Sequence, residues 1–241
     1  MTRLDKPVPG KSTAMPLNVS YRVDRIADLI AGKWLDLGCA EGGYAAELLS
    51  RGATEVVGVD ADETRVAEAN SRNLPAASFQ VALSEKLPFP AEDFDGVFMN
   101  EVLEHVTDEE ATLSEIFRVL RPGGRLVLIS PNRWFPFEGH GLRTSRFSTD
   151  TPVPLLPWLP QSLAGRWMAA RNYWPRELLK QAKNAGFTIE RFGFIWPVLE
   201  VYPWLPPGLR DGYQARIRFF DSVPVLRRFG VSTLIVGRKA S

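Results

Sequence analysis

The chain has 241 residues, 45% of them hydrophobic and 24% charged, which is ordinary for a soluble globular protein with a sizeable core. Its single cysteine, Cys39, excludes an intrachain disulfide framework and a thiolate metal cluster and favours a reducing compartment, so we expect a cytoplasmic location. Residues 1–12 lack the apolar run of a secretory signal, and no stretch reaches the roughly eighteen consecutive apolar residues of a membrane span.

The formal net charge of +1 hides an asymmetry between the two halves. Residues 1–130 contain 13 Lys and Arg against 21 Asp and Glu, whereas residues 131–241 contain 16 against 7. The basic half suits an anionic partner such as a phosphate, a carboxylate or a lipid headgroup surface, and the acidic half suits a cationic ligand. The alternative, that both are simply solvated surfaces, stays open.

The N-terminal part begins with residues 1–17, which are rich in proline and polar groups and predict a loose arm. Helical spacing follows over residues 21–32, where Val23, Ile26 and Ile30 share one face and Gly32 supplies the stop.

Short apolar runs then alternate with stretches of helical length. The runs are KWLDLG, EVVGVD, DGVFMN and RLVLIS, and the helical stretches cover residues 42–50, 62–72 and 108–120. Continuous hydrophobicity is typical of parallel strands that are buried on both faces. The pattern predicts an α/β, doubly wound, Rossmann-like sheet with helices on both faces, and ligands bind at the shared edge where such strands end.

The C-terminal half predicts a helix ending at Gly186, a strand after it, and an antiparallel last strand, STLIVGRK. We expect one domain over residues 1–241, with a cofactor-binding half at 18–131 and two insertions at 132–172 and 194–229. Five of the seven tryptophans lie in the insertions: Trp134, Trp158, Trp167, Trp196 and Trp204. Long aromatic loops favour a lid over an acceptor, flanked by the arginines Arg133, Arg143 and Arg146; the alternative for the aromatic residues is ordinary packing.

The first predicted strand ends in a glycine-rich loop, LDLGCAEGG, at residues 35–43. Its glycines do not match the G-x-G-x-x-G fingerprint of dinucleotide sites, and the adjacent carboxylates Asp36 and Glu41 disfavour a pyrophosphate. An acidic, glycine-lined pocket suits a ligand with a positive centre, an amino acid moiety and a ribose. Asp60, at the end of the second strand, is placed to accept two ribose hydroxyls.

Four motifs in this order resemble the class I S-adenosylmethionine-dependent methyltransferases. They are LDLGCAEGG, VVGVD, LPFPAEDFDGVFMNEVLEHV and RVLRPGGRLVLIS, and together they cover about residues 30–131. The resemblance implies S-adenosylmethionine as the cofactor and methyl transfer as the activity. The alternatives for single residues are that Asp36 caps a helix and that Asp60 forms a turn.

The resemblance also implies where the cofactor contacts lie. Its methionine end would meet Asp36, Gly38 and Gly42, with backbone contacts from Cys39 and Ala40, the latter in place of a more frequent glycine. The ribose would meet Asp60, and the adenine Ala61 and the segment with Leu83 and Ser84. Leu83 replaces an acid that is frequent in the family, which leaves adenine recognition to the backbone, to apolar packing or to Glu85. Asn100 or Glu101 would lie beside the sulfonium.

Two histidines, His105 and His140, follow the fourth and fifth strands. Glu101, Glu104 and His105 stand at i, i+3 and i+4, which on a helix makes one face. We favour His105 or His140 as general base for a hydroxyl acceptor, with Glu101 and Glu104 as orienting groups. Two alternatives stay open: these residues hold a divalent metal ion, as in a Glu-x-x-Glu-His arrangement that some O-methyltransferases show, or His105 only packs.

The sequence therefore predicts a methyltransferase that acts on an oxygen of a small-molecule, glycan or lipid-linked acceptor. The alternatives are N- or C-methylation and a catalytically silent cofactor-binding or regulatory module. Scattered basic residues disfavour nucleic acid as a partner. Basic, aromatic loops permit contact with a membrane surface, through Trp204, Arg210, Arg216 and Arg218. The sequence does not indicate the oligomeric state.

Overall fold

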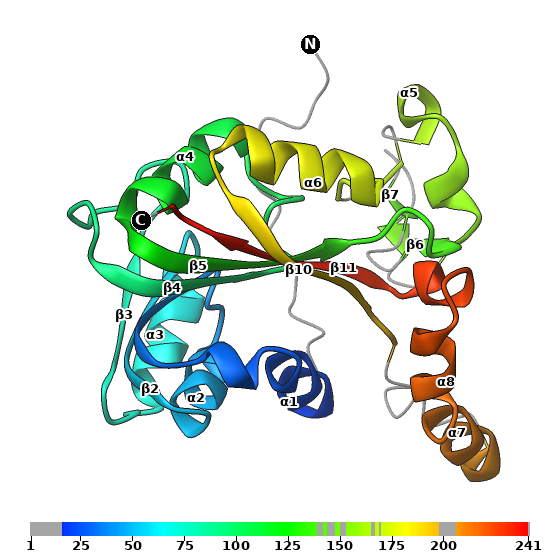
Figure 1. Ribbon diagram of the computed structural model, residues 1–241, viewed down its shortest axis with the longest axis horizontal. Coiled ribbons are helices and arrows are strands. Elements are labelled where there is room, and N and C mark those ends of the chain that lie inside the picture. The colour runs from blue at the N-terminus through cyan, green and yellow to red at the C-terminus, as the bar shows by residue number, and fades with distance from the viewer. Residues whose placement is uncertain are drawn as a thin grey trace.

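The computed structural model describes residues 16–138, 142–143, 148–149, 153–164, 167–168, 170–197 and 206–240. Its centre is a seven-stranded sheet with the order β10-β11-β5-β4-β1-β2-β3 (Figure 1). The strands are β1 Gly32–Leu37, β2 Ala53–Asp60, β3 Ala77–Val81, β4 Phe94–Asn100, β5 Leu120–Pro131, β10 Thr188–Ile195 and β11 Ser232–Arg238. β11 runs antiparallel to both β5 and β10, and the pairs from β5 to β3 are parallel, so the expected mixed sheet is confirmed.

Helices cover both faces of the sheet. α1 Pro16–Asp24, α2 Gly43–Ser50 and α3 Glu63–Ser71 lie on one face, and α4 Glu109–Val119 and α6 Pro175–Asn184 lie on the other (Figure 1). Each layer of helices packs on its own apolar cluster. Trp34, Leu48 and Phe98 are buried in one cluster, and Leu113 and Leu178 in the other. Burial on both faces is what the continuous apolar runs required.

The helix starts follow from capping residues in the sequence. Asp62 accepts hydrogen bonds from the N–H groups of Thr64 and Arg65, and Asp108 accepts one from Ala111. These carboxylates satisfy N–H groups that have no partner within α3 and α4. Both helices therefore begin one residue inside the stretches expected from periodicity.

The helix expected over residues 21–32 is interrupted. α1 ends at Asp24 and a separate 3-10 turn, η1, covers Ala27–Leu29. Between them the Ile26 N–H donates to Val23 O at 3.0 Å, and both of these side chains are fully buried. The tight turn brings both apolar side chains into the core. α1 also begins at Pro16, two residues inside the segment expected to be a loose arm.

The C-terminal insertions lie at the end of the sheet where β5 stops and β11 starts, because Pro131 pairs with Ser232. The first contains two small ladders, β6 Phe137–Glu138 with β9 Val153–Pro154 and β7 Leu142–Arg143 with β8 Ser148–Thr149, then η2 Leu156–Trp158 and α5 Gln161–Ala164. The second contains α7 Pro207–Gln214, α8 Ile217–Ser222 and η4 Leu226–Phe229. No helix in the described part of the chain combines the length and apolarity needed to cross a membrane.

Candidate functional site

The glycine loop after β1 is built by backbone contacts with β2. The N–H groups of Gly38 and Cys39 both donate to Val59 O, at 2.8 and 2.9 Å. Gly38 has φ +78°, and a Cβ at this position would collide with the Val102 side chain in the turn after β4. Glycine tolerates the positive φ and has no Cβ to collide with Val102. It therefore lets the loop come closer to the end of β4 than a residue with a side chain would.

Asp60 joins this loop to the turn after β2. Its Oδ2 accepts from the Ala40 N–H at 3.0 Å and its Oδ1 from the Asp62 N–H at 2.9 Å. Ala40 has φ +46°, a left-handed conformation that directs its N–H toward the carboxylate. Asp60 is half-buried, and the exposed Ala61 follows it. Each carboxylate oxygen has further lone pairs, which leaves this group able to accept hydrogen bonds from a ligand.

Asp36 lies behind the glycine loop, in β1. Its side chain is buried, and among the described residues its Oδ2 has no hydrogen-bond partner. Burial, and then the negative charge of Asp60, raises the pKa of Asp36 to about 7. A buried carboxylate oxygen with no partner is stabilised by a donor or cation from a ligand. Burial also raises the pKa of the neighbouring Cys39 thiol, which makes it a poor nucleophile.

Arg22 of α1 reaches across to the ends of β4 and β11. Its Nη1 lies 2.6 Å from Asn100 Oδ1 and 2.9 Å from Glu101 Oε1, and its Nη2 lies 3.3 Å from Ser232 Oγ. Ser232 Oγ donates in turn to Glu101 Oε1 at 2.6 Å. Glu101 therefore stays in a fixed position beside the cofactor loops, held by a cation that the sequence did not point to.

The segment with Glu101, Glu104 and His105 is not helical, so these residues do not form the helix face that their spacing would allow. Residues 101–106 form bends and turns, and α4 begins only at Glu109. Glu101 has φ +55°, a left-handed conformation that a helix does not accommodate. The turn keeps the two side chains near each other: Glu104 Oε1 lies 4.0 Å from His105 Nε2. This distance is too long for a hydrogen bond.

Glu104 points into the protein. Its carboxylate oxygens are buried without a hydrogen-bond partner among the described residues. Burial, and then the neighbouring Glu101 carboxylate, raises the pKa of Glu104 well above its usual range. Glu101 is paired with Arg22, and the His105 side chain stays partly exposed.

Two residues from the segment before α6 hold this turn from outside. Arg171 Nε donates to Glu104 O at 3.3 Å, its Nη2 donates to Val106 O, and its Nη1 lies 3.0 Å from Glu109 Oε1. The Tyr173 hydroxyl lies 3.0 Å from Leu103 O and 2.7 Å from Glu109 Oε1. Sequence reasoning missed both residues, since nothing in their local pattern connects them to a turn about seventy positions earlier.

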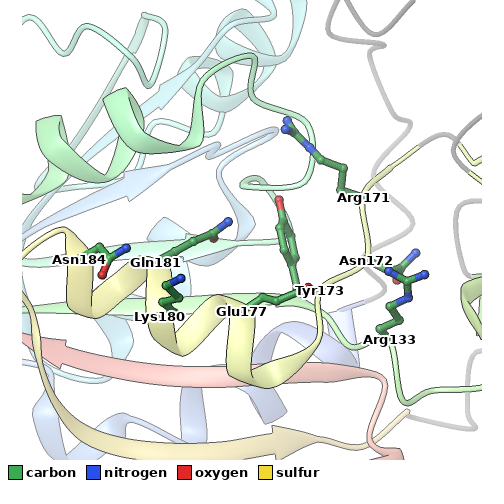
Figure 2. A pocket seen from close by; sticks show the side chains of 8 residues that line it. All are labelled: Arg133, Arg171, Asn172, Tyr173, Glu177, Lys180, Gln181 and Asn184. Atoms are coloured by element: carbon green, nitrogen blue, oxygen red, sulfur yellow. The ribbon is translucent and has the colours of Figure 1, made fainter. Parts of the chain in front are cut away.

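A hollow of about 460 Å³ adjoins this contact (Figure 2). It is lined by Arg133, Arg171, Asn172, Tyr173, Glu177, Lys180, Gln181 and Asn184. Figure 2 shows Tyr173 directed toward the turn after β4, while Arg133 and Asn172 lie near the first insertion; Gln181 Nε2 donates to Glu109 Oε2 of α4. The hollow is therefore a neighbour of the turn that carries His105.

The predicted adenine segment follows β3. Leu83 is exposed, whereas the Ser84 hydroxyl is buried between Glu85 Oε2 at 3.1 Å and Thr112 Oγ1 at 3.2 Å. Glu85 Oε1 accepts from the Thr107 N–H at 2.9 Å, which fastens this segment to the start of α4. The three possibilities for adenine recognition therefore stay predictions.

Some predicted residues lie outside the described part of the chain: His140, Arg146 and Trp204. The approach of His140 to His105 therefore stays a prediction. In the described ranges, no three His, Cys, Asp or Glu side chains are grouped so as to hold a metal ion.

Comparison with known proteins gives matches to this arrangement. A family model described as a methyltransferase domain matches residues 35–128. A probable S-adenosylmethionine-dependent methyltransferase of Mycolicibacterium smegmatis is 34% identical over 69% of this chain and 56% of its own length. A ubiquinone biosynthesis O-methyltransferase of Mesorhizobium japonicum is 30% identical over 72% of this chain and 71% of its own. A crystal structure of an S-adenosylmethionine-dependent methyltransferase from Mesorhizobium loti superposes with a TM-score of 0.64 at 17% identity, over 94% of this chain and 99% of that one.

These matches differ in what they show. The chain spans little more than half the length of the M. smegmatis relative. At 17% identity the structural match shows the fold alone. The M. japonicum relative is matched over most of both chains, and the family model covers the strands and loops that carry Asp36, Gly38, Asp60 and Glu101. By fold, motif and sequence, the chain belongs to the class I S-adenosylmethionine-dependent methyltransferases.

Proposed function

We propose that this protein transfers a methyl group from S-adenosylmethionine to an oxygen of a small-molecule, glycan or lipid-linked acceptor. The observation that supports S-adenosylmethionine as the cofactor is the presence of two carboxylates, Asp60 and Asp36, on either side of the glycine loop. Asp60 holds lone pairs for the ribose hydroxyls, and the unpartnered Oδ2 of Asp36 suits the ammonium group of the methionine end. When bound, the cofactor supplies an electrophilic methyl group on a sulfonium.

In this proposal the remaining cofactor contacts come from the loops after β1, β2, β3 and β4. Gly38, Cys39, Ala40 and Gly42 present backbone to the methionine end, and Asn100 lies beside it. Ala61 and Leu83 enclose the adenine, and Ser84 anchors the segment that carries Leu83 through its contact with Thr112. Methyl transfer is an in-line displacement, so holding donor and acceptor close and aligned supplies much of the rate.

His105 is the base that we assign to the acceptor hydroxyl. It is a partly exposed member of the turn after β4, and a neutral imidazole can take a proton near neutral pH. Glu101 and Glu104 act as positioning residues: Glu101 is held by Arg22, and Glu104 is buried with its carboxylate 4.0 Å from His105 Nε2. His140 is the second candidate for the base. Oxygen as the methylated atom is supported by these histidines and by the printed name of the M. japonicum relative.

The cofactor assignment is tested by calorimetric titration with S-adenosylhomocysteine. Asp60→Ala removes the acceptor of two charge-assisted hydrogen bonds, each worth about 1.5–3 kcal/mol, so we expect an affinity loss of about 100-fold or more. Asp62→Ala is the matched control, because it removes a helix cap one turn away without a proposed cofactor contact. Binding by the parent protein of NADH instead, or equal affinity in the Asp60 variant, would refute the assignment.

The acceptor assignment is tested by following S-adenosylhomocysteine release with a panel of phenols and alcohols. If His105 removes the proton, His105→Ala lowers kcat by about 10²- to 10⁴-fold and abolishes the acidic limb of the pH profile. The same loss in His140→Ala alone would move the role to that residue. Full turnover in both variants would point to N- or C-methylation, which needs no such base.

A further inference from the structure

The first insertion contains large apolar side chains that are exposed to solvent rather than packed in its own core. Leu155, Trp158, Leu159, Leu163 and Trp167 are between 40% and 56% exposed. They lie in a stretch whose own small core consists of Leu156 and Met168 with Val153 packed against them. We name the described residues between 153 and 168 the α5 arm. So many exposed tryptophan and leucine side chains within one short segment indicate an interaction surface rather than scattered surface residues.

The α5 arm is held in position from the body of the protein. Arg133 Nε donates to Pro157 O at 2.7 Å and its Nη2 to Leu159 O at 2.6 Å, and its guanidinium lies 5.1 Å from the centre of the Trp174 ring. These bonds fix the backbone on both sides of Trp158. Exposure of Trp158 and Leu159 is therefore part of the folded arrangement.

The second insertion presents a similar surface at the same end of the molecule. Leu209, Phe219 and Val225 are at least 58% exposed, and we name residues 206–229 the α7–α8 arm. Figure 1 shows α5 on one side and α7 and α8 on the other side of the sheet edge at which β5 ends. Asn100 pairs with Ile129 near that end of β5, so the candidate site opens at the edge between the two arms.

The net positive charge of the two arms indicates which kind of partner they bind. The sequence of the α5 arm, residues 153–168, contains one Arg and no Asp or Glu, and residues 206–229 contain five Arg against two Asp. A second copy of this chain would bring these like charges together across a twofold interface. Tryptophan and leucine side chains flanked by arginines are instead typical of segments that lie in the interface of an anionic bilayer.

We propose that the α5 arm and the α7–α8 arm dock this protein on the surface of an anionic lipid bilayer, with the carboxyl edge of the sheet facing the lipid. The exposed apolar side chains enter the headgroup region, and the arginines pair with lipid phosphates. If the proposed function holds, the acceptor is then one whose apolar tail resides in the bilayer. The docking itself depends on neither cofactor nor acceptor.

The test is co-sedimentation of the full chain with vesicles at low salt. One set contains phosphatidylcholine alone, and the other contains about one third phosphatidylglycerol. We expect binding to the anionic vesicles, and a loss of at least about tenfold in the double variant Trp158→Gln with Leu163→Gln. Trp167→Gln is a second, independent variant. The matched control is Phe192→Gln on β10, an exposed aromatic residue outside both arms, which should bind as the parent protein does.

Folding is checked by circular dichroism and by S-adenosylhomocysteine titration, which the arm substitutions should leave unchanged. No binding by the parent protein, or undiminished binding by both arm variants, would overturn the proposal. So would a stable dimer that the arm substitutions dissociate without any vesicle binding, since a second copy would then occupy this surface. A failure of docking would leave the proposed methyl transfer standing, because that is measured without vesicles.

Discussion

Asp36 is a buried carboxyl group whose protonation follows from its surroundings. Burial and the charge of Asp60 raise its pKa from 3.8 to about 7. Between these values the folded protein binds more protons at this group than the unfolded chain does. The contribution of this group to the free energy of unfolding therefore falls as the pH rises through this window, by on the order of 4 kcal/mol in total, and is constant above it.

Asp36→Asn removes this dependence in the cofactor-free protein. We expect the free energy of unfolding of the variant, minus that of the parent, to increase from about pH 4 to about pH 7 and then to level off. Urea unfolding over this range measures the difference. A difference that does not change with pH would show that Asp36 is ionised throughout, and that its surroundings do not act as described.

Arg22 and Glu101 form an ion pair of which the arginine is almost wholly buried. Glu101→Ala removes the carboxylate that lies 2.9 Å from that cation, so we expect a loss of about 2–4 kcal/mol in the free energy of unfolding. Replacing the cation as well, in Arg22→Met with Glu101→Ala, should recover part of the loss. The matched control is Glu190→Ala, which breaks the more exposed Arg125 pair at 2.8 Å and should cost less than about 1 kcal/mol. Equal costs at the two sites would contradict a buried role for Arg22.

Two of the glycines between β1 and α2, Gly38 and Gly43, have different functions. Gly38 has φ +78° and no room for a Cβ beside Val102, so Gly38→Ala should lower the free energy of unfolding by about 2–4 kcal/mol and weaken cofactor binding. Gly43 is the first residue of α2, and a Cβ there would meet nothing within 4 Å. Gly43→Ala should be neutral or stabilise by up to about 1 kcal/mol. Thermal unfolding of both variants checks this, and equal effects would show that the close approach to Val102 is unimportant.

The elements that the sequence predicted well are those with a local cause. Asp62 and Asp108 mark helix starts because a cap acts within three residues, and the apolar runs mark strands because both faces of the sheet are covered. Glu101, Glu104 and His105 do not share a helix face, as their spacing would allow. The i, i+3, i+4 spacing also occurs in a turn, and here the left-handed Glu101 sends the chain over Gly38 before α4 begins.

The parts of the site that the sequence did not reveal depend on contacts between distant elements. Arg22 meets Asn100 and Glu101 only because α1 packs under the end of β4, and Tyr173 reaches Leu103 only because Asn132 pairs with Tyr173 at the end of β5. Composition and periodicity do not contain these pairings. The positions of Asp36, Gly38 and Asp60 at the edge of the sheet could be predicted, because the ends of parallel strands can be aligned from the sequence alone.

At the scale of the whole molecule, charge and apolar exposure coincide at one end. Residues 131–241 carry the excess of basic residues, and six of these sixteen lie in the sequence of the two arms, which flank the edge where the glycine loop lies. An anionic surface would therefore orient the protein before the exposed tryptophan and leucine side chains make contact. Orientation and anchoring then come from two different forces, which respond differently to salt.

This separation predicts how vesicle binding depends on ionic strength. Each arginine near an anionic bilayer contributes about 1 kcal/mol at moderate salt, so raising the salt from about 0.1 to about 0.5 M should weaken binding by tenfold or more. Affinity for S-adenosylhomocysteine should change little over the same range, because its proposed contacts with Asp36 and the glycine loop are sheltered from solvent ions. Sedimentation and calorimetry in matched buffers compare the two. Vesicle binding that ignores salt would mean that the apolar side chains act alone, and the charge asymmetry would then have no part in docking.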